Sequence, residues 1–386
     1  MAIPIAAHVV PTLLDGSNDR CETQIAPAAV ERLFDTTLYE LRLFPGAALA
    51  VYCRDRCVLT RFGGYADTQG GEFITPDSLF PLFSGSKPFA SIALWQQIER
   101  GHTDLDEAVA SHWPEFAQNG KGQVRIRHIL SHRGGFPGTP TEMPRETWGD
   151  WDRAIQAIEA MPLRHEPGTV SAYHDLTQHW VCAELVQRLD GRTYPTYVYD
   201  DIAGPLALHD TFIGLPAIEE QRVVKLHATD GTDDRGRAVV RAMHDDPLYR
   251  KVVPGASAVS SARDMARFYA AIAAGGVLGG NRILRAETVA AMLRMEVDGE
   301  VDQTFGVPVR RCLGFELGGQ DDPRRHWAGA TSTARTFWHG GFGSSVCWGD
   351  ADTGLAMAFL TNGVRRDEAG ALARRDLSDA VRSLSS

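Results

Sequence analysis

Phe83-Ser84-Gly85-Ser86-Lys87 is expected to lie where a loop turns into a helix. Ser84 and Lys87 then stand about one helical turn apart and on the same face. The lysine amine can accept the proton of the serine hydroxyl, which is a poor nucleophile at its ordinary pKa. Backbone N–H groups at the helix start can hold a developing oxyanion. Ser-x-x-Lys alone is weak evidence, because serine caps helices and lysine is common on their surfaces.

The residues before this stretch predict a helix followed by a hairpin. Apolar side chains recur at helical spacing across 25–44, which predicts an amphipathic helix that ends at Pro45-Gly46. Residues 47–53 and 57–62 are typical of two strands joined by a polar turn, and Gly63-Gly64 is expected to close the hairpin. A helix and an antiparallel hairpin favour an α+β sheet covered by helices over a βαβ nucleotide-binding fold.

The residues after Ser84 predict a mostly helical stretch and then a return to strands. The helix is expected to continue over 90–100 and to stop at Gly101. Much later, the acidic run at 230–236 is expected to be a solvated loop, because it lacks the ligand spacing of a calcium site. Further helices are expected around 124–131, 176–189, 262–274 and 286–295. Short strands are expected at 337–338, 345–348 and 355–360, with a final helix at 372–384.

Composition limits the partners that the chain can bind. It has 386 residues, of which 44% are hydrophobic and 23% charged, as in a globular protein with a full core. Its formal net charge of −10, without a run of Lys and Arg, argues against nucleic acid or an anionic membrane as a partner. A small molecule or another protein is the expected partner, and the oligomeric state stays open.

The cysteines and the N-terminal residues bear on the compartment. Six scattered cysteines do not make a disulfide framework, so reduced thiols are expected. Cys53 and Cys57 could face each other across the hairpin, but no second pair completes a metal site. The first nineteen residues hold no Lys or Arg and are interrupted by Pro4 and Pro11, so no signal peptide is evident. No apolar run has membrane-spanning length, and a soluble cytoplasmic protein is expected.

Two further stretches carry residues suited to catalysis. Tyr173-His174-Asp175 lies just before a predicted helix. Trp338-His339-Gly340-Gly341-Phe342-Gly343 places a histidine and two glycines on what is expected to be an edge strand. Glycines there let a substrate's ester group approach the backbone closely, where side chains would block it. Backbone N–H groups of this strand can also bind an oxyanion.

With three motifs in this order, the chain resembles the penicillin-recognising serine hydrolases. These comprise class C β-lactamases, D-Ala-D-Ala carboxypeptidases and family VIII carboxylesterases. The family's Ser-x-x-Lys, Tyr-x-Asn and Lys/His-Thr/Gly-Gly motifs correspond to Ser84–Lys87, Tyr173–Asp175 and His339–Gly341. The stretches 125–132 and 260–268 are similar as well, so the resemblance covers nearly the whole chain.

The resemblance implies a β-lactamase/transpeptidase-like α+β fold. An α/β sandwich domain would be built from residues 1–100 and 301–386 around an antiparallel sheet. A mostly helical domain, residues 101–300, would be inserted between its halves. The substrate cleft would lie between the two units, where clefts commonly form. No metal or organic cofactor is implied.

The resemblance also implies the roles of individual residues. Ser84 is the acylated nucleophile, and Lys87 and Tyr173 share the removal of its proton and the later delivery of a proton to the leaving group. The backbone N–H groups of Ser84 and Phe342 form the oxyanion hole. The residues expected to bind the substrate are Asp175, Trp338, His339, Gly340 and Gly341.

Two residues depart from the family's pattern. Asp175 replaces the usual Asn, and a carboxylate near Lys87 favours the ammonium form, which is expected to shift the base role toward Tyr173. His339 replaces the lysine that meets the substrate carboxylate in β-lactamases and carboxypeptidases. A largely neutral histidine offers less fixed positive charge. Both changes favour neutral esters over β-lactams.

Other interpretations of these residues stay open. Tyr173 could be an ordinary buried tyrosine, and Asp175 could orient the lysine or cap the next helix. His174 is expected to point away from the site, because both its neighbours are motif positions. His128 and His132 have the i, i+4 spacing of a zinc helix, but no third ligand is apparent. Hydrogen bonding within the following loop is the expected role of these two histidines.

The sequence therefore predicts hydrolysis of carboxylic esters through an acyl-enzyme on Ser84. A β-lactamase, a D-amino-acid peptidase or amidase, and an acyltransferase would use the same machinery. A non-catalytic scaffold of the same fold is the alternative from another class, and intact Ser84, Lys87 and Tyr173 argue against it. The chain has no Gly-x-Ser-x-Gly elbow, which argues against an α/β-hydrolase.

Overall fold

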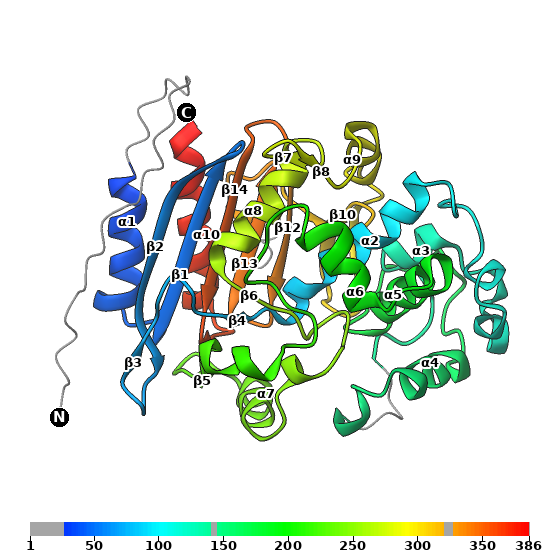
Figure 1. Cartoon of the computed structure of the whole chain (residues 1–386), viewed down its shortest axis with the longest axis horizontal. Helices are drawn as coiled ribbons and strands as arrows, with labels where there is room; N and C mark the ends of the chain where they lie inside the picture. Colours follow the sequence, from blue (N-terminus) through cyan, green and yellow to red (C-terminus); the bar gives the residue numbers. More distant parts are fainter. Residues whose placement is uncertain (1–26, 140–144, 320–326, 386) are drawn as a thin grey trace.

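The computed structural model describes residues 27–139, 145–319 and 327–385. Within these ranges the chain builds an antiparallel sheet of nine strands, in the order β3-β2-β1-β14-β13-β12-β11-β10-β9 (Figure 1). The predicted α+β class, with an antiparallel sheet flanked by helices, is confirmed. The strands are β1 (Gly46–Cys53), β2 (Arg56–Asp67), β3 (Glu72–Phe73), β9 (Val297–Asp302), β10 (Val307–Arg311), β11 (Glu316–Leu317), β12 (Thr336–Gly341), β13 (Ser345–Asp350) and β14 (Leu355–Thr361).

Helices cover both faces of this sheet. α1 (Ala28–Asp35) and α10 (Glu368–Arg382) lie on one face, and α8 (Ala262–Ala273) lies on the other (Figure 1). Alternate residues of a strand point to opposite faces, and in β1 both sets are buried. One set packs in the core beneath α1 and α10, and the other packs in the core beneath α8. The two sets are Ala47, Leu49 and Val51, and then Ala48, Ala50 and Tyr52.

A second group of helices surrounds α2 (Lys87–Glu99) beside the sheet (Figure 1). α2 is buried along nearly its whole length and packs against α5 (Thr177–Asp190). Because a helix that is apolar on all sides is fixed by packing, the Ser84 turn at its start is held in place. The other helices are α3 (Ile126–Leu130), α4 (Trp151–Ala160), α6 (Tyr194–Val198), α7 (Asp234–Asp245) and α9 (Ala286–Met292).

Short two-stranded ladders connect the sheet to the helices. β4 lies just before Ser84 and pairs antiparallel with β6, which lies just before α8. This pairing joins the start of α2 to the start of α8, so the turn that holds Ser84 is tied to the helix that covers the sheet. The short strands are β4 (Phe80–Pro81), β5 (His227–Ala228), β6 (Val259–Ser260), β7 (Val277–Leu278), β8 (Asn281–Arg282) and β15 (Gly363–Val364).

Most of the secondary structure predicted from the sequence is confirmed. The four predicted helices between 124 and 295 are α3, α5, α8 and α9, and the C-terminal strands and helix are β12, β13, β14 and α10. The predicted end of the first hairpin at Gly63-Gly64 is wrong, because β2 continues to Asp67. Glycine is needed at position 64 within the strand, since its φ is +80° and a Cβ there would lie 2.2 Å from the carbonyl oxygen of Pro45.

Other elements were not foreseen. The run 230–236, predicted as a loop, contains the start of α7 at Asp234. The side chain of Asp233 caps this helix by accepting a hydrogen bond from the N–H of Gly236 at 2.7 Å. α4, β9, β10 and β11 were also not predicted. Among the helices of the described ranges, none combines the length and the apolar character that a membrane crossing requires.

Candidate active site

Ser84 lies in a single 3-10 turn, Phe83–Ser86, that leads directly into α2. Phe83 adopts a positive φ of 48°, a strained conformation for a bulky residue. The hydroxyl of Ser86 stabilises the turn by donating to the carbonyl of Phe83 at 2.6 Å and accepting from the N–H of Ala258 at 3.0 Å. The Ser84 side chain is the partly exposed position in this otherwise buried turn.

Lys87 is buried directly behind the nucleophile. Its Nζ lies 2.9 Å from the Oγ of Ser84, 2.6 Å from the carbonyl oxygen of Asp175 and 3.0 Å from the carbonyl oxygen of Gly255. Burial lowers the pKa of Lys87 from 10.5 to about 7, although the carboxylate of Asp175 acts in the opposite direction. About half of the amine is therefore neutral near pH 7, and it lies within hydrogen-bonding distance of the proton it would remove.

The hydroxyl of Tyr173 also forms a hydrogen bond with Ser84. Its ring lies between the rings of His132 and Phe305, with centroid distances of 4.6 and 4.7 Å. The Nζ of Lys87 is 5.2 Å from the ring centroid of Tyr173. Burial raises the pKa of Tyr173 well above its ordinary value, so the phenol keeps its proton at neutral pH.

A buried ion cluster supports Tyr173. The guanidinium of Arg311 lies 5.7 Å from the Tyr173 ring centroid and donates to Asp302 at 2.6 Å and to Glu316 at 2.9 Å. All three charged side chains are almost completely buried. The sequence analysis missed this cluster, because its members stand on β9, β10 and β11 and share no motif with the catalytic stretches.

The third motif occupies β12 and the turn that follows it. β12 pairs with β13 along its length, whereas its pairing with β11 covers only Trp338 and Phe337. The prediction of an edge strand is therefore wrong for the strand as a whole, although the half that holds the glycines extends past β11. A Cβ on Gly341 would lie 2.1 Å from the carbonyl oxygen of Leu82, so only glycine permits this approach to the Ser84 turn.

Phe342 brings a second strained turn beside the nucleophile. Its φ is +22°, and the N–H of Ser344 donates to the carbonyl of Gly341 at 2.7 Å across the turn. The rings of Phe342 and Phe83 have centroids 5.7 Å apart, so the two strained turns are adjacent. Strained backbone often marks functional sites, and here it occurs at the two turns whose N–H groups were predicted to bind the oxyanion.

These elements enclose a cleft of 310 Å³. The structure brings most of the predicted site residues together around it, while Lys87 and Gly341 lie behind the lining residues. The predicted residues in the lining are Ser84, Tyr173, Asp175, Trp338, His339, Gly340 and Phe342. The lining residues that the sequence analysis did not predict are Arg235, Phe305, Val307, Glu316, Trp327, Gly343 and Arg366.

Two arginines at the cleft stack on the same aromatic ring. The guanidinium groups of Arg235 and Arg366 lie 5.4 and 4.5 Å from the ring centroid of Phe342. Arg235 also pairs with Asp175 at 3.5 Å, and Arg366 pairs with Asp233 at 3.4 Å. No catalytic motif contains either arginine, because one comes from α7 and the other from the segment before α10.

The expected role of Asp175 needs correction. Its carbonyl oxygen, and not its carboxylate, accepts the hydrogen bond of Lys87, while the carboxylate pairs with Arg235. The lowered pKa of Lys87 and the raised pKa of Tyr173 make the lysine the better base, which is the reverse of the sequence-based expectation. Asp175 does not cap α5 either, since the N-cap of that helix is Leu176 and no side chain caps it.

The histidines of the second motif region have structural contacts. His128 accepts a hydrogen bond from the N–H of Arg125 at 3.1 Å, and His132 accepts one from the N–H of His174 at 3.0 Å. The ring of His174 packs against Phe136 and is not among the residues that line the cleft. Across the part of the chain that the structure describes, no cluster of three or more His, Cys, Asp or Glu residues could hold a metal ion.

Comparison with known proteins agrees with this geometry. A family model described as Beta-lactamase matches residues 33–381. The chain belongs to the beta-lactamase family. It is 28% identical over 364 residues to the esterase/beta-lactamase LipL of Mycobacterium tuberculosis, which covers 87% of this chain and 81% of that protein.

Solved structures show the same relationship. A family VIII carboxylesterase has a TM-score of 0.81 and 27% identity, with coverage of 92% of this chain and 97% of that one. A penicillin-binding protein homologue from Caulobacter crescentus has a TM-score of 0.79 and 28% identity, with the same two coverages. The protein is a serine hydrolase of the β-lactamase/transpeptidase-like fold.

Proposed function

We propose that the protein hydrolyses carboxylic esters through an acyl-enzyme on Ser84, with Lys87 as the base. The observation that carries this proposal is the 2.9 Å contact between the Nζ of Lys87 and the Oγ of Ser84, at a lysine whose pKa is lowered to about 7. A neutral amine at this distance can take the hydroxyl proton as the oxygen attacks. The partly exposed hydroxyl faces a cleft in which an ester can bind.

Acylation then runs through one proton transfer in each direction. The Oγ of Ser84 attacks the ester carbonyl carbon, and its proton passes to Lys87. The tetrahedral intermediate collapses, the bond to the alcohol oxygen breaks, and that oxygen receives a proton from the Tyr173 hydroxyl. Tyr173 is reprotonated from the Lys87 ammonium, since the raised pKa of the tyrosine favours its protonated form. Deacylation repeats these steps with water as the nucleophile and Ser84 as the leaving group.

The oxyanion of the intermediate would be held by the N–H groups of Ser84 and Phe342. Support comes from the adjacency of their turns, the strain at Phe83 and Phe342, and the absence of a Cβ at Gly341. Preorganised N–H donors of this kind need no rearrangement when charge develops on the carbonyl oxygen. The guanidinium groups of Arg235 and Arg366 on the Phe342 ring add positive charge beside this position.

Esters are proposed as substrates because of the residues around the cleft. His339 stands where β-lactamases and carboxypeptidases of the family resemblance have a lysine for the substrate carboxylate. The cleft is largely aromatic, with Phe305, Trp327 and Trp338 beside Phe342, which suits apolar acyl or alcohol groups. Similarity to a family VIII carboxylesterase and to an esterase/beta-lactamase adds to this support.

The test compares hydrolysis of short-chain p-nitrophenyl esters with hydrolysis of a chromogenic cephalosporin. Wild type, Ser84→Ala and Ser111→Ala are assayed side by side. Ser111 is an exposed serine in a separate 3-10 turn and serves as a matched control. We expect ester turnover in wild type and Ser111→Ala, none in Ser84→Ala, and little cephalosporin cleavage in any of them. A fluorophosphonate probe should label the peptide that contains residue 84 in wild type and Ser111→Ala, and should not label it in Ser84→Ala.

Each other outcome has a defined meaning. Ester turnover that persists in Ser84→Ala contradicts the mechanism. Cephalosporin cleavage as fast as ester cleavage contradicts the choice of esters and favours a β-lactamase. Labelling of Ser84 without hydrolysis of either substrate contradicts esterase activity and favours acyl transfer to a specific acceptor. If neither labelling nor turnover is observed, the non-catalytic scaffold is favoured.

A further inference from the structure

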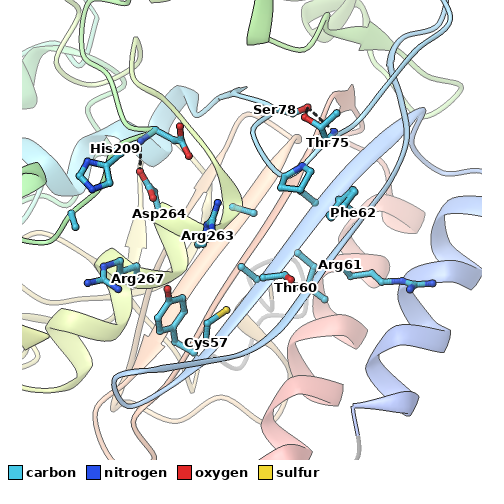
Figure 2. Close-up of a pocket in the computed structure, with 18 residues that line it drawn as sticks. Cys57, Thr60, Arg61, Phe62, Thr75, Ser78, His209, Arg263, Asp264 and Arg267 are labelled. Carbon is cyan, nitrogen blue, oxygen red and sulfur yellow. Dashed lines mark hydrogen bonds between the residues drawn. The ribbon is translucent and has the colours of Figure 1, made fainter. Parts of the chain in front are cut away.

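A second cavity lies away from the catalytic cleft. It has a volume of 780 Å³ and is enclosed by β1, β2, the segment after β3, the loop before Asp210 and the start of α8 (Figure 2). None of its lining residues belongs to the lining of the cleft around Ser84. A cavity of this size can take a small organic molecule. The mechanism derived above does not use it.

The base of the cavity is the face of β1 and β2 that looks toward α8. Ala48 pairs with Phe62, and Ala50 pairs with Thr60, in the register of the two strands. Small alanine side chains on β1 leave space that larger residues would fill, and Phe62 adds an apolar surface beside them. Figure 2 shows Phe62 and Thr60 on one side of the cavity and Arg263 and Arg267 of α8 on the other. This part of the cavity suits an apolar group.

The α8 side of the cavity is positively charged. Arg263 and Arg267 stand at i and i+4 on α8, so their side chains lie on the same side of the helix and repel each other. Arg267 is held by a bond from its Nε to the carbonyl of Leu206 at 2.5 Å and by a hydrogen bond with the phenol of Tyr52. Among the residues that the structure describes, no carboxylate forms an ion pair with either arginine.

The acidic residues of the lining form their hydrogen bonds and ion pairs with other partners. The Oδ2 of Asp264 accepts from the N–H of Asp210 at 2.7 Å and from the hydroxyl of Thr211 at 3.1 Å, and Figure 2 shows the first of these bonds. Asp210 forms an ion pair with Arg222. The third guanidinium of the lining, Arg61, pairs with Asp35 of α1 at 2.6 Å. Of the described arginines that line the cavity, Arg263 and Arg267 are therefore the two with no carboxylate ion pair.

We propose that this cavity is a second binding site, for a monocarboxylate with an apolar chain. The carboxylate lies between the guanidinium groups of Arg263 and Arg267, whose planar N–H donors match its two oxygens. The chain lies over Ala48, Ala50 and Phe62. The binding relieves the repulsion between the two arginines and covers apolar surface at the same time. The ligand needs both its carboxylate and its apolar chain, because neither part alone would contact both the arginines and the apolar base of the cavity.

The test measures binding of octanoate to the full chain by calorimetry. Wild type is compared with the double variant Arg263→Gln/Arg267→Gln and with the control Arg237→Gln/Arg241→Gln. The control pair also stands at i and i+4, on α7, is exposed, and loses the same net charge away from the cavity. Thr60→Phe is a further variant, which keeps both arginines and fills the space above β2. Only variants whose circular dichroism spectrum and thermal unfolding midpoint match those of wild type are used in the comparison.

The proposal predicts binding of octanoate that is at least tenfold weaker in Arg263→Gln/Arg267→Gln and in Thr60→Phe, and unchanged in the α7 control. Octanol and acetate, which carry only one part of the ligand each, should bind at least tenfold more weakly than octanoate to wild type. Octanoate binding that survives the loss of both arginines overturns the proposal. An equal loss of octanoate binding in the α7 control variant also overturns the proposal. So does binding of inorganic phosphate that is as tight as binding of octanoate. In either case binding would depend on net charge alone.

Discussion

Replacement of the buried lysine by methionine, Lys87→Met, should change how the stability of the protein depends on pH. The pKa of Lys87 falls from 10.5 to about 7 in the folded protein because burial disfavours the ammonium. Below about pH 7 both the folded and the unfolded chain carry the proton, and burial of the charge costs about 5 kcal/mol, at about 1.36 kcal/mol per unit of pKa. Above about pH 10.5 both forms are neutral and the cost disappears.

Between these limits only the unfolded chain holds the proton, so the stability of wild type rises with pH. The expected gain from about pH 7 to pH 9 is about 2 kcal/mol relative to Lys87→Met, in which the titrating group is absent. Urea unfolding at both pH values measures this difference. Lys225→Met is the matched control, because that lysine is exposed, its pKa is raised by Asp67, and it stays charged across this range in both states. Parallel pH dependence in wild type and Lys87→Met would refute the argument that Lys87 is largely neutral at its site.

Three further predictions concern catalysis. The kcat/KM for a short p-nitrophenyl ester should rise with pH through about 7 as Lys87 loses its proton, and be roughly tenfold lower at about pH 6 than on the plateau; a flat profile would contradict the base assignment. Arg235→Gln should move this rise to higher pH by about half a unit, because the carboxylate of Asp175 loses its partner and stabilises the Lys87 ammonium; an unchanged midpoint would exclude this influence. Gly341→Ala should lower kcat by about a hundredfold or more with the fold intact by circular dichroism, because a Cβ would lie 2.1 Å from the Leu82 carbonyl and separate the two turns; activity near wild type would argue against an oxyanion hole there.

The sequence was sufficient to predict the fold class and to select candidate catalytic residues that the structure brings to one cleft. Ser84 and Lys87 are close along one helix, so their contact follows from helical spacing alone. Tyr173 and His339 could be placed at the same cleft only through the order of the motifs, because they come from distant segments. The glycines of the third motif indicated a close backbone approach, which the contact with Leu82 explains.

The surroundings of the site could not be predicted, because they depend on contacts between segments that share no local pattern. His132 stacks on Tyr173, and Gly255 supplies a carbonyl to Lys87 from 168 residues away in sequence. Asp175 was correctly placed near Lys87, but the sequence does not tell whether its carboxylate or its carbonyl faces the amine. Nor does the sequence tell how deeply Lys87 is buried, and burial is the largest cause of its lowered pKa.

The carboxylates around the site are paired with arginines. Asp302 and Glu316 are both bound by Arg311, and the carboxylate of Asp175 pairs with Arg235. The Lys87 amine donates to two carbonyls and the serine hydroxyl and not to a carboxylate, and burial outweighs the nearby negative charge of Asp175. Titratable groups whose pKa values are pushed apart divide into an acid and a base. Here burial is the largest cause of both shifts, and the carboxylate of Asp175 opposes the first and adds to the second.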